Sequence, residues 1–339
     1  MRIGDVEIGT RVFVVAEVGS NHNGDFAVAR ELVWAAARAG ADAVKFQVYR
    51  GDRLVQKDQA TLSHVRGLHR TQRERFQRLE FIQAQWEELA GVARDAGIVF
   101  FASVFDEESA DRMDPLMPAF KIASGDLTNL PLLRHVAKKG KPVILSTGMA
   151  TVEEIAEAIE VLPQDRLVLL HCVSSYPTPL EEANLRAIPF LRERFAVPAG
   201  YSDHTTGITA CLAAVALGAV ALEKHFTFDK SQLLGDHRLS ADPNDLARLV
   251  SGVREIERAL GRPEKVPGET ERRMREAMRR SLYTRRALPA GALLEAEDVI
   301  CLRPAGGLPP SALDRVIGRR VRRPLAAEEL LREEDLEEV

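Results

Sequence analysis

The stretch VVAEVGSNHNGD, residues 14–25, joins a short apolar run to a cluster of hydrogen-bonding side chains. The apolar run reaches Ala16, and Glu17 then stands where a buried strand would end. Asn23 or Asp25 can cap a following helix, because Asn and Asp side chains accept hydrogen bonds from the free N–H groups of a first helical turn. A cap explains one polar residue, so Glu17 and the other members of the cluster require a different explanation.

The same pattern recurs along the chain and predicts the fold. The β-branched or aromatic runs that resemble strands are RVFVVAEVG (11–19), DAVKFQVY (42–49), IVFFASVF (98–105), AFKIASG (119–125), KPVILSTG (141–148), RLVLLHCVS (166–174), VPAGYSDH (197–204) and VALEKHFT (220–227). Segments with an apolar spacing of three to four residues separate these runs or follow the last one, as at 26–40 and 244–261. Eight such alternations over about 260 residues predict an α/β fold of the (β/α)8 TIM-barrel class. An open doubly wound sheet is the competing architecture, but residues 17–25 lack the G-x-G-x-x-G turn of dinucleotide-binding folds.

Polar residues gather at the carboxyl end of almost every predicted strand, and this explains Glu17. They are Glu17, Lys45 with Gln47, Ser103, Lys121 with Ser124, Ser146 with Thr147, His171 with Ser174, Asp203 with His204, and Glu223 with His225. In a TIM barrel the carboxyl ends of all strands meet at one rim, where active sites are built. The sequence therefore predicts one active site at this rim.

Composition restricts the class of protein. The 339 residues include 45% apolar and 28% charged residues, enough for one large core and a small second one. The formal charge of -4 leaves no basic field for nucleic acid or an anionic membrane. No targeting signal and no apolar run of about 20 residues is present, and Cys172, Cys211 and Cys301 form no C-x-x-C pattern. We expect a cytoplasmic protein with neither a nucleic-acid nor a membrane partner.

Two lysines inside predicted strands point to an anionic ligand. Lys45 in VKFQ and Lys121 in FKIAS lie where a lysine is rarely tolerated without a partner. One interpretation is that they form ion pairs with Glu17 and Glu223. The functional interpretation is a ligand that carries a phosphate or a carboxylate.

Two histidines at the ends of neighbouring predicted strands suggest a metal site. His204 in YSDHTTG and His225 in EKHFT can converge across one strand spacing. Two imidazole nitrogens, completed by ligand oxygens or waters, suit a divalent ion with open coordination positions.

Several motifs, in order along nearly the whole chain, resemble one enzyme family. They are AEVGSNHNGD, AVKFQVYRGDRLV, FASVFDEESAD, PAFKIASGDLTNLPLL, GKPVILSTGMAT, LLHCVSSYPTPLEEANLRA, GYSDHTTG and EKHFTFDK. These motifs closely resemble the sialic acid (N-acetylneuraminate) synthase family, whose members are phosphoenolpyruvate-dependent synthases of nine-carbon nonulosonic acids. The resemblance implies a metal-dependent condensation of phosphoenolpyruvate with an open-chain N-acyl aminosugar, either N-acetylmannosamine or a related deoxy-diacetamido sugar, with release of phosphate.

The resemblance also implies a role for individual residues. It assigns proton handling to Glu17 and a divalent ion to His204 and His225. That ion is manganese, with magnesium or cobalt as alternatives, and it polarises the sugar aldehyde. Gln47, Tyr176 and Asp236 match residues that contact the sugar in the family. The residues that match its phosphoenolpyruvate-binding groups are Lys45, Lys121, Ser124, Ser146, Ser174 and Ser202.

Three departures from the family pattern concern the rim. LLGDHRLSADP (233–243) lacks the proline that relatives carry before Asp236, and Ser174 replaces an amide found in some relatives. The segment 59–75 has no clear match, so a phosphate ligand expected from it is not assigned. We expect its two histidines, His64 and His69, to be solvated.

The chain changes character after the predicted barrel, which we assign to residues 1–262. Residues 263–280 are polar and arginine-rich and predict a linker with a short helix. Residues 281–339 resemble the antifreeze-like (SAF, β-clip type) domain that ends these synthases. Within them, RRALPAGALLEAEDV (285–299) repeats as RRPLAAEELLREEDL (322–336), which predicts a duplicated unit.

Arg303, in LRPAGGLPP, matches a family arginine that reaches the sugar in the barrel of a partner subunit. The resemblance therefore implies a domain-swapped homodimer in which Arg303 contributes to catalysis and to sugar binding.

Three other functions stay open at this point. The two buried lysines also suit a Schiff-base aldolase acting on pyruvate. A related phosphoenolpyruvate-dependent synthase could use an aldose phosphate, and the last domain alone suggests an ice-binding or scaffolding protein.

Overall fold

The computed structural model describes residues 1–60, 71–232 and 235–338. The chain divides into two compact units, Met1–Gly261 and Arg262–Val339. The predicted linker, 263–280, lies in the second unit and contains helix α11 (Glu269–Met278).

The first unit is the predicted TIM barrel. Its strands are β3 (Phe13–Gly19), β4 (Ala43–Val48), β5 (Val99–Val104), β6 (Phe120–Ile122), β7 (Val143–Ser146), β8 (Leu167–Cys172), β9 (Ala199–Asp203) and β10 (Ala221–His225). All pairs are parallel, and β10 closes the barrel against β3. Each of the eight predicted runs contains one of these strands, so the fold class is confirmed.

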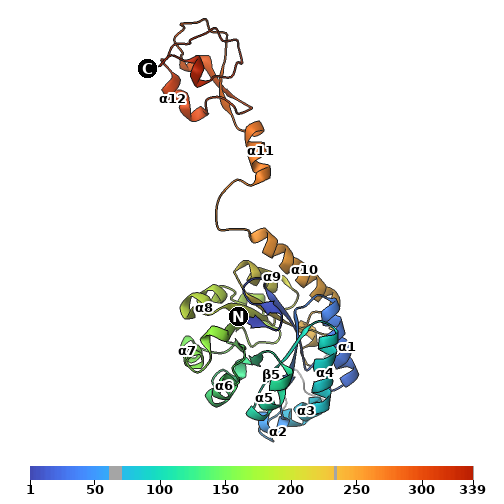
Figure 1. Cartoon of the computed structure of the whole chain (residues 1–339). Coiled ribbons are helices and arrows are strands. Elements are labelled where there is room, and N and C mark those ends of the chain that lie inside the picture. Colours follow the sequence, from blue (N-terminus) through green and yellow to red (C-terminus); the bar gives the residue numbers. More distant parts are fainter. Residues whose placement is uncertain (61–70, 233–234, 339) are drawn as a thin grey trace. The chain divides into compact units, whose positions relative to one another are not determined.

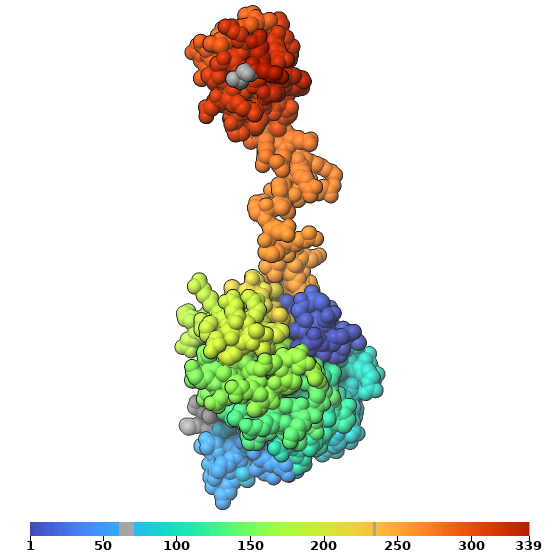
Figure 2. All heavy atoms as spheres, turned by 60° about the vertical axis from the view of Figure 1, so that its left-hand side comes forward, coloured from blue at the N-terminus to red at the C-terminus, as the bar shows by residue number. Residues whose placement is uncertain are grey.

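Helices surround the strands (Figure 1). They are α1 (Phe26–Arg38), α2 (Gly51–Leu54), α3 (Gln72–Leu79), α4 (Gln83–Asp95), α5 (Glu107–Met113), α6 (Leu130–Ala137), α7 (Val152–Glu160), α8 (Ala187–Phe195), α9 (Thr209–Ala216) and α10 (Pro243–Leu260). Asp25 caps α1 by accepting hydrogen bonds from the N–H groups of Ala27 and Val28, as the sequence predicts. Figure 2 shows that segments from the middle of the chain, coloured green and yellow, form one face of this unit. Every residue of β3 is buried, because helices cover the strands outside and side chains fill the barrel inside.

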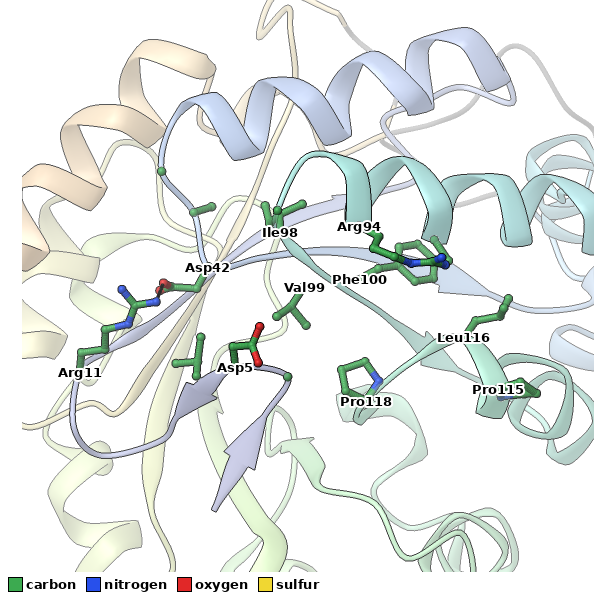
Figure 3. Close-up of a pocket in the computed structure, with 16 residues that line it drawn as sticks. Asp5, Arg11, Asp42, Arg94, Ile98, Val99, Phe100, Pro115, Leu116 and Pro118 are labelled. Atoms are coloured by element: carbon green, nitrogen blue, oxygen red, sulfur yellow. Dashed lines mark ion pairs between the residues drawn. The ribbon is translucent and has the colours of Figure 1, made fainter.

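A short hairpin of β1 (Arg2–Ile3) and β2 (Val6–Glu7) precedes the barrel and was not anticipated from the sequence. It borders a cavity of about 600 Å³ at the amino ends of β4 and β5. Figure 3 shows Arg11 beside the buried Asp42 at this cavity, where they form an ion pair of 2.6 Å. Asp42 also pairs with Arg254 at 2.8 Å, which ties the start of β4 to α10.

The second unit contains a repeated structural element. Its strands β11 (Ser281–Thr284) and β12 (Val299–Leu302) are antiparallel, and its other helix is α12 (Leu313–Val316). In the first repeat Arg286 donates to Asp298 at 2.6 Å, and in the second Arg323 donates to Asp335 at 2.8 Å. Each aspartate lies in a single 3-10 turn, so the duplicated sequence forms two equivalent turns.

Among the described residues, no helix combines the length and the apolar character needed to cross a lipid bilayer.

Candidate active site

The carboxyl ends of the barrel strands bring together a buried cluster of charged residues. Glu17 and Lys45 occupy paired positions on β3 and β4, and Lys45 Nζ lies 2.7 Å from Glu17 Oε2. The ammonium also lies 3.6 Å from Glu223 Oε1 and donates to Ser103 Oγ at 2.9 Å. Gln47 completes the group by donating to Glu17 Oε1 at 3.2 Å. Thus Lys45 does pair with both carboxylates, as one interpretation of the sequence held.

A second buried lysine lies on the same inner face. Lys121 is 2% exposed and donates to Ser146 Oγ at 2.6 Å and to the carbonyl of Ile122 at 2.9 Å. Within the described residues, no carboxylate lies within ion-pair distance of Lys121. Lys121 therefore does not form the ion pair that the same interpretation gave it, and it donates to two neutral oxygens instead.

Burial and the neighbouring lysines shift the pKa values of the two carboxyl groups of this cluster in opposite directions. Burial raises the pKa of Glu17 well above its usual range, although the neighbouring Lys45 opposes the shift. Burial would also raise the pKa of Glu223, but Lys121 and Lys45 outweigh it and lower that pKa. Two carboxyl groups in one site with opposite shifts can hold one proton on Glu17 and a charge on Glu223.

A cavity of about 530 Å³ opens beside the cluster. Four predicted site residues line it: Gln47, Ser124, Ser174 and Tyr176. Tyr49, Phe76 and Phe105 form another part of its wall, with Phe76 and Phe105 rings 4.9 and 5.7 Å from the ring of Tyr49. No lysine or arginine lines this cavity within the described parts of the chain.

The two predicted metal ligands face each other. The ring centroids of His204 and His225 are 5.4 Å apart, and both side chains are buried. The Nδ1 of His204 lies 2.7 Å from the carbonyl of Val173, so this nitrogen carries the proton and leaves Nε2 with a lone pair. Burial and the facing His225 lower the pKa of His204 to about 4, while burial lowers the pKa of His225 to about 3. Both imidazoles are therefore neutral at pH 7, which is the form that binds metal.

Predicted sugar-contacting residues border the histidines. The ring of Tyr176 lies 4.1 Å from the ring of His204, and Asp236 Oδ2 lies 3.7 Å from His225 Nδ1. Ser202 is close as well, because its hydroxyl donates to Glu223 Oε1 at 3.1 Å.

These residues fit a divalent ion. His225 Nδ1 is buried and has no hydrogen-bond partner in the described structure, and the same holds for Glu223 Oε2 and Ser174 Oγ. Two neutral imidazoles with a carboxylate nearby are a suitable donor set for manganese, magnesium or cobalt. The described residues contain no group of three or more His, Cys, Asp or Glu side chains able to hold a metal. An ion held by two histidines would have coordination positions left for substrate or water.

Some polar residues of the first loop are structural. Asn21 donates to the carbonyl of Phe226 at 3.0 Å and to Ser240 Oγ at 2.9 Å. The ring of His22 packs 4.5 Å from that of Phe81 and accepts the N–H of Gly24. The contacts of Asn21 tie the loop after β3 to the loop after β10, whereas His22 packs against the segment that precedes α4.

Two residues predicted to face the active site at the rim point away from it. The outer faces of β8 and β9 carry His171 and Asp203, respectively. His171 stacks on Tyr201 and lies 2.9 Å from the carbonyl of Ala183, while Asp203 pairs with Lys224 and accepts from Cys211. Side chains alternate along a strand, so Asp203 points away from the inward-facing Ser202.

From the sequence, no catalytic role was assigned to Glu223, and no ligand-binding role was assigned to Ser103 or Cys172. Cys172 lies 3.0 Å from Ser124 Oγ. For Glu223 a signal was present, because it alternates with Lys224 in ALEKH and shares a face with His225.

Arg303 lies on the second unit, where it is exposed and precedes a cis peptide bond to Pro304. Its assigned sugar contact in a partner subunit stays a prediction. His64, His69 and most of the segment 59–75 lie outside the described residues.

Comparison with known proteins gives a consistent result. Residues 32–265 match the NeuB family, and residues 279–337 match the SAF domain. The chain is 42% identical over 326 residues to an N,N'-diacetyllegionaminic acid synthase of Legionella pneumophila, covering 93% of this chain and 92% of the relative. It is 36% identical over 334 residues to the N-acetylneuraminate-9-phosphate synthase of Mus musculus, covering 96% and 92%.

A solved structure supports the same relationship. The N-acetylneuraminic acid (sialic acid) synthetase of Leptospira borgpetersenii, determined in complex with citrate, superimposes with a TM-score of 0.74 at 35% identity. The superposition covers 81% of this chain and 94% of that chain.

The buried neutral histidines predict how stability depends on pH. Since the pKa of His204 is lowered to about 4, the unfolded chain binds a proton between pH 6.5 and 4 that the folded chain does not. In metal-free protein, the free energy of unfolding should therefore fall as pH is lowered through this window. His204→Asn should reduce the slope by up to about 1.4 kcal/mol per pH unit, measured by urea unfolding at several pH values. Equal slopes in the two proteins would contradict a neutral buried His204.

Proposed function

We propose, from the premise that this chain belongs to the NeuB family of phosphoenolpyruvate-dependent nonulosonic acid synthases, that it condenses phosphoenolpyruvate with a neutral N-acyl aminosugar. The observation that carries the choice of sugar is the cavity beside Tyr49, whose described lining contains no cation. The sugar we favour is a deoxy-diacetamido hexose, with N-acetylmannosamine as a poorer substrate.

The anionic substrate would occupy the lysine cluster. Lys121 is buried without a carboxylate at ion-pair distance among the described residues, and Lys45 can contribute charge because the raised pKa of Glu17 favours its neutral form. A phosphate and a carboxylate suit two such cations, with hydroxyl groups adding hydrogen bonds. The hydroxyl donors we assign are Ser124, Ser146, Ser174 and Ser202.

Glu17 would supply the proton that the condensation requires. The enol carbon of phosphoenolpyruvate forms a C–C bond to the sugar aldehyde carbon, and the aldehyde oxygen takes a proton from Glu17. Water then adds to the former enol C2, and one of its protons returns to the carboxylate of Glu17. Cleavage of the C2–O bond releases phosphate, which takes the remaining hydroxyl proton as C2 becomes the ketone carbon of the product. Glu223 stays ionised near this carbon, where it stabilises developing positive charge.

His204 and His225 would hold the divalent ion, which as a Lewis acid polarises the carbonyl group of the sugar. Tyr176, Gln47 and Asp236 lie around the histidines and the cavity, where they can orient the hydroxyl groups of an open-chain sugar.

The apolar part of the cavity favours a sugar without a second phosphate. Tyr49, Phe76 and Phe105 offer ring surface to acetamido methyl groups and a deoxy carbon. A phosphorylated sugar would find no cation in the described lining of this cavity, and a buried phosphate without a partner is costly. Family membership sets aside the Schiff-base aldolase and the non-enzymatic scaffold.

A substrate panel tests the choice of sugar. With phosphoenolpyruvate and manganese, phosphate release should be fastest with 2,4-diacetamido-2,4,6-trideoxy hexoses, slower with N-acetylmannosamine and lowest with its 6-phosphate. Excess chelator should abolish release, and added manganese should restore it. Preference for the 6-phosphate would refute a neutral sugar, and full activity in chelator would refute the metal requirement.

Separate variants distinguish proton handling from anion binding. Glu17→Gln keeps the shape but removes the proton, so kcat should fall roughly 10²-fold or more with little change in the KM for phosphoenolpyruvate. Lys121→Met should instead raise that KM first. Glu255→Gln, exposed on α10, is the matched control and should behave as wild type. A Glu17→Gln enzyme with wild-type kcat would exclude this role.

The proposed contribution of Arg303 from a partner subunit can be tested by mixing variants. Arg303→Ala and Glu17→Gln should each be nearly inactive alone. After subunit exchange, one site of the heterodimer would combine an intact Glu17 with an intact Arg303 and should regain activity. A monomer at assay concentration, or exchange without recovery, would rule out the shared site.

A further inference from the structure

A buried ion pair lies outside the barrel, directly behind the two proposed metal ligands. Lys224 Nζ is 2.7 Å from Asp203 Oδ2, and the two side chains are 1% and 0% exposed. They occupy paired positions of β10 and β9, and each immediately precedes one of the two histidines, His225 and His204. Because side chains alternate along a strand, this pair faces α9 while the histidines face the site.

The pair holds the backbone on both sides of His204. Lys224 Nζ donates to the carbonyl of Thr205 at 2.5 Å as well as to Asp203, so one ammonium spans the residues that flank His204. Asp203 Oδ1 accepts the N–H of Thr205 at 2.8 Å, which closes the same turn from the other side.

Every contact of Asp203 restricts its carboxylate. Tyr201 donates to Oδ1 at 3.2 Å, and Cys211 on α9 donates to Oδ2 at 3.2 Å. Together with Thr205 and Lys224, these groups give each carboxylate oxygen two donors. A carboxylate fixed in this way cannot change rotamer without losing several hydrogen bonds at once.

The strand ladder alone does not hold His204. The pairing of β9 with β10 ends at the Lys224–Asp203 pair, and β9 itself ends at Asp203. His204 therefore lies beyond the ladder, whereas His225 is still the last residue of β10. Contacts outside the ladder hold it instead: its Nδ1 lies 2.7 Å from the carbonyl of Val173, and its carbonyl accepts the N–H of Thr178 at 2.8 Å. The Lys224–Asp203 pair adds the contacts that fix the residues on either side of His204.

Stability alone gives no reason for a charged pair at this place. A buried ion pair loses hydration, and well-packed apolar residues of similar volume are often equally stable or more so. Its hydrogen bonds, in contrast, specify one backbone arrangement, which an apolar pair cannot do.

We propose that Asp203 and Lys224 are positioning residues that set the separation and orientation of His204 and His225 for a divalent ion. They act from the outer face of the barrel and contact neither the ion nor the substrates. This inference rests on the proposed metal site.

The experiment measures manganese binding to metal-stripped protein without substrates, from the electron paramagnetic resonance signal of free Mn²⁺. The double variant Asp203→Leu/Lys224→Met removes both charges and keeps similar volume, so it should fold, as circular dichroism will show. Its affinity for Mn²⁺ should be about 10- to 100-fold weaker than that of wild type.

The matched control removes another ion pair of the same barrel. Asp42 and Arg254 lie 2.8 Å apart at the amino end, far along the strands from the histidines, and Asp42 is buried. Asp42→Leu/Arg254→Met should keep the Mn²⁺ affinity within about twofold of wild type. Should Asp203→Leu/Lys224→Met fail to fold, Tyr201→Phe and Lys224→Arg take its place. Tyr201→Phe should weaken binding several-fold, whereas Lys224→Arg, which keeps the charge, should stay closer to wild type.

Three results would overturn the inference, and they are distinguishable. Unchanged Mn²⁺ affinity in Asp203→Leu/Lys224→Met, with a large loss in His204→Ala and His225→Ala, would refute the positioning role and leave the metal site intact. Unchanged affinity in the histidine variants would refute the metal site itself, and the inference with it. A loss no greater than that of the Asp42→Leu/Arg254→Met control would show a general effect of destabilisation.

Discussion

The alternation of side chains along the strands of a closed barrel is the constraint on which the site depends. Each strand residue faces either the barrel interior or the surrounding helices, and no edge strand offers an alternative. On β10, Glu223 and His225 face inward, so Lys224 must face the helices. A lysine there is isolated from water and requires an acid, which Asp203 provides from the paired position of β9. The pairing register of β9 and β10 thus determines which charged side chains lie inside the barrel and which lie outside it.

Burial inside the barrel gives ordinary side chains unusual protonation states. Glu17 and Glu223 lie 2.7 and 3.6 Å from the ammonium of Lys45, and both are almost completely buried. Removing such charges from water costs several kcal/mol for each ion, so the cluster lowers its energy by protonating one carboxyl group. Glu17 is the carboxyl group that is more readily protonated, because burial raises its pKa whereas Lys121 and Lys45 lower the pKa of Glu223. An acid and two cations in one buried site suit an anionic substrate whose reaction needs a proton.

The sequence predicted the strands and most of the rim because both produce local patterns. Each strand is a short apolar run, and each polar residue at a strand end interrupts such a run. The prediction of the rim was wrong for Asp203 and His171. Both are polar residues at strand ends, but their side chains point out of the barrel. Counting alternate positions from Ser202 would have found the error for Asp203. The hairpin β1–β2 was missed because strands of two residues carry no periodic signal. Arg303 lies in the second compact unit. Its proposed contact is with the sugar in a partner subunit, and a pattern in the sequence of one chain cannot test such a contact.

Barrel closure explains the polar cluster with which the first strand ends. The ends of β3 and β10 are separated by about 200 residues in sequence, yet Glu17 and His225 occupy paired positions across the closing strand pair. The loops that follow these strands must therefore be held together if the proposed acid and metal ligand are to keep their distance. Asn21 performs this task by donating to Phe226 and Ser240, and Asn23 extends it by donating to Gln232 at 2.8 Å. Ser240 in turn donates to the carbonyl of Asp236, so the same contacts position a proposed sugar-binding residue. Because these bonds join the first and last strands, the rim can take its final geometry only after the whole barrel has closed.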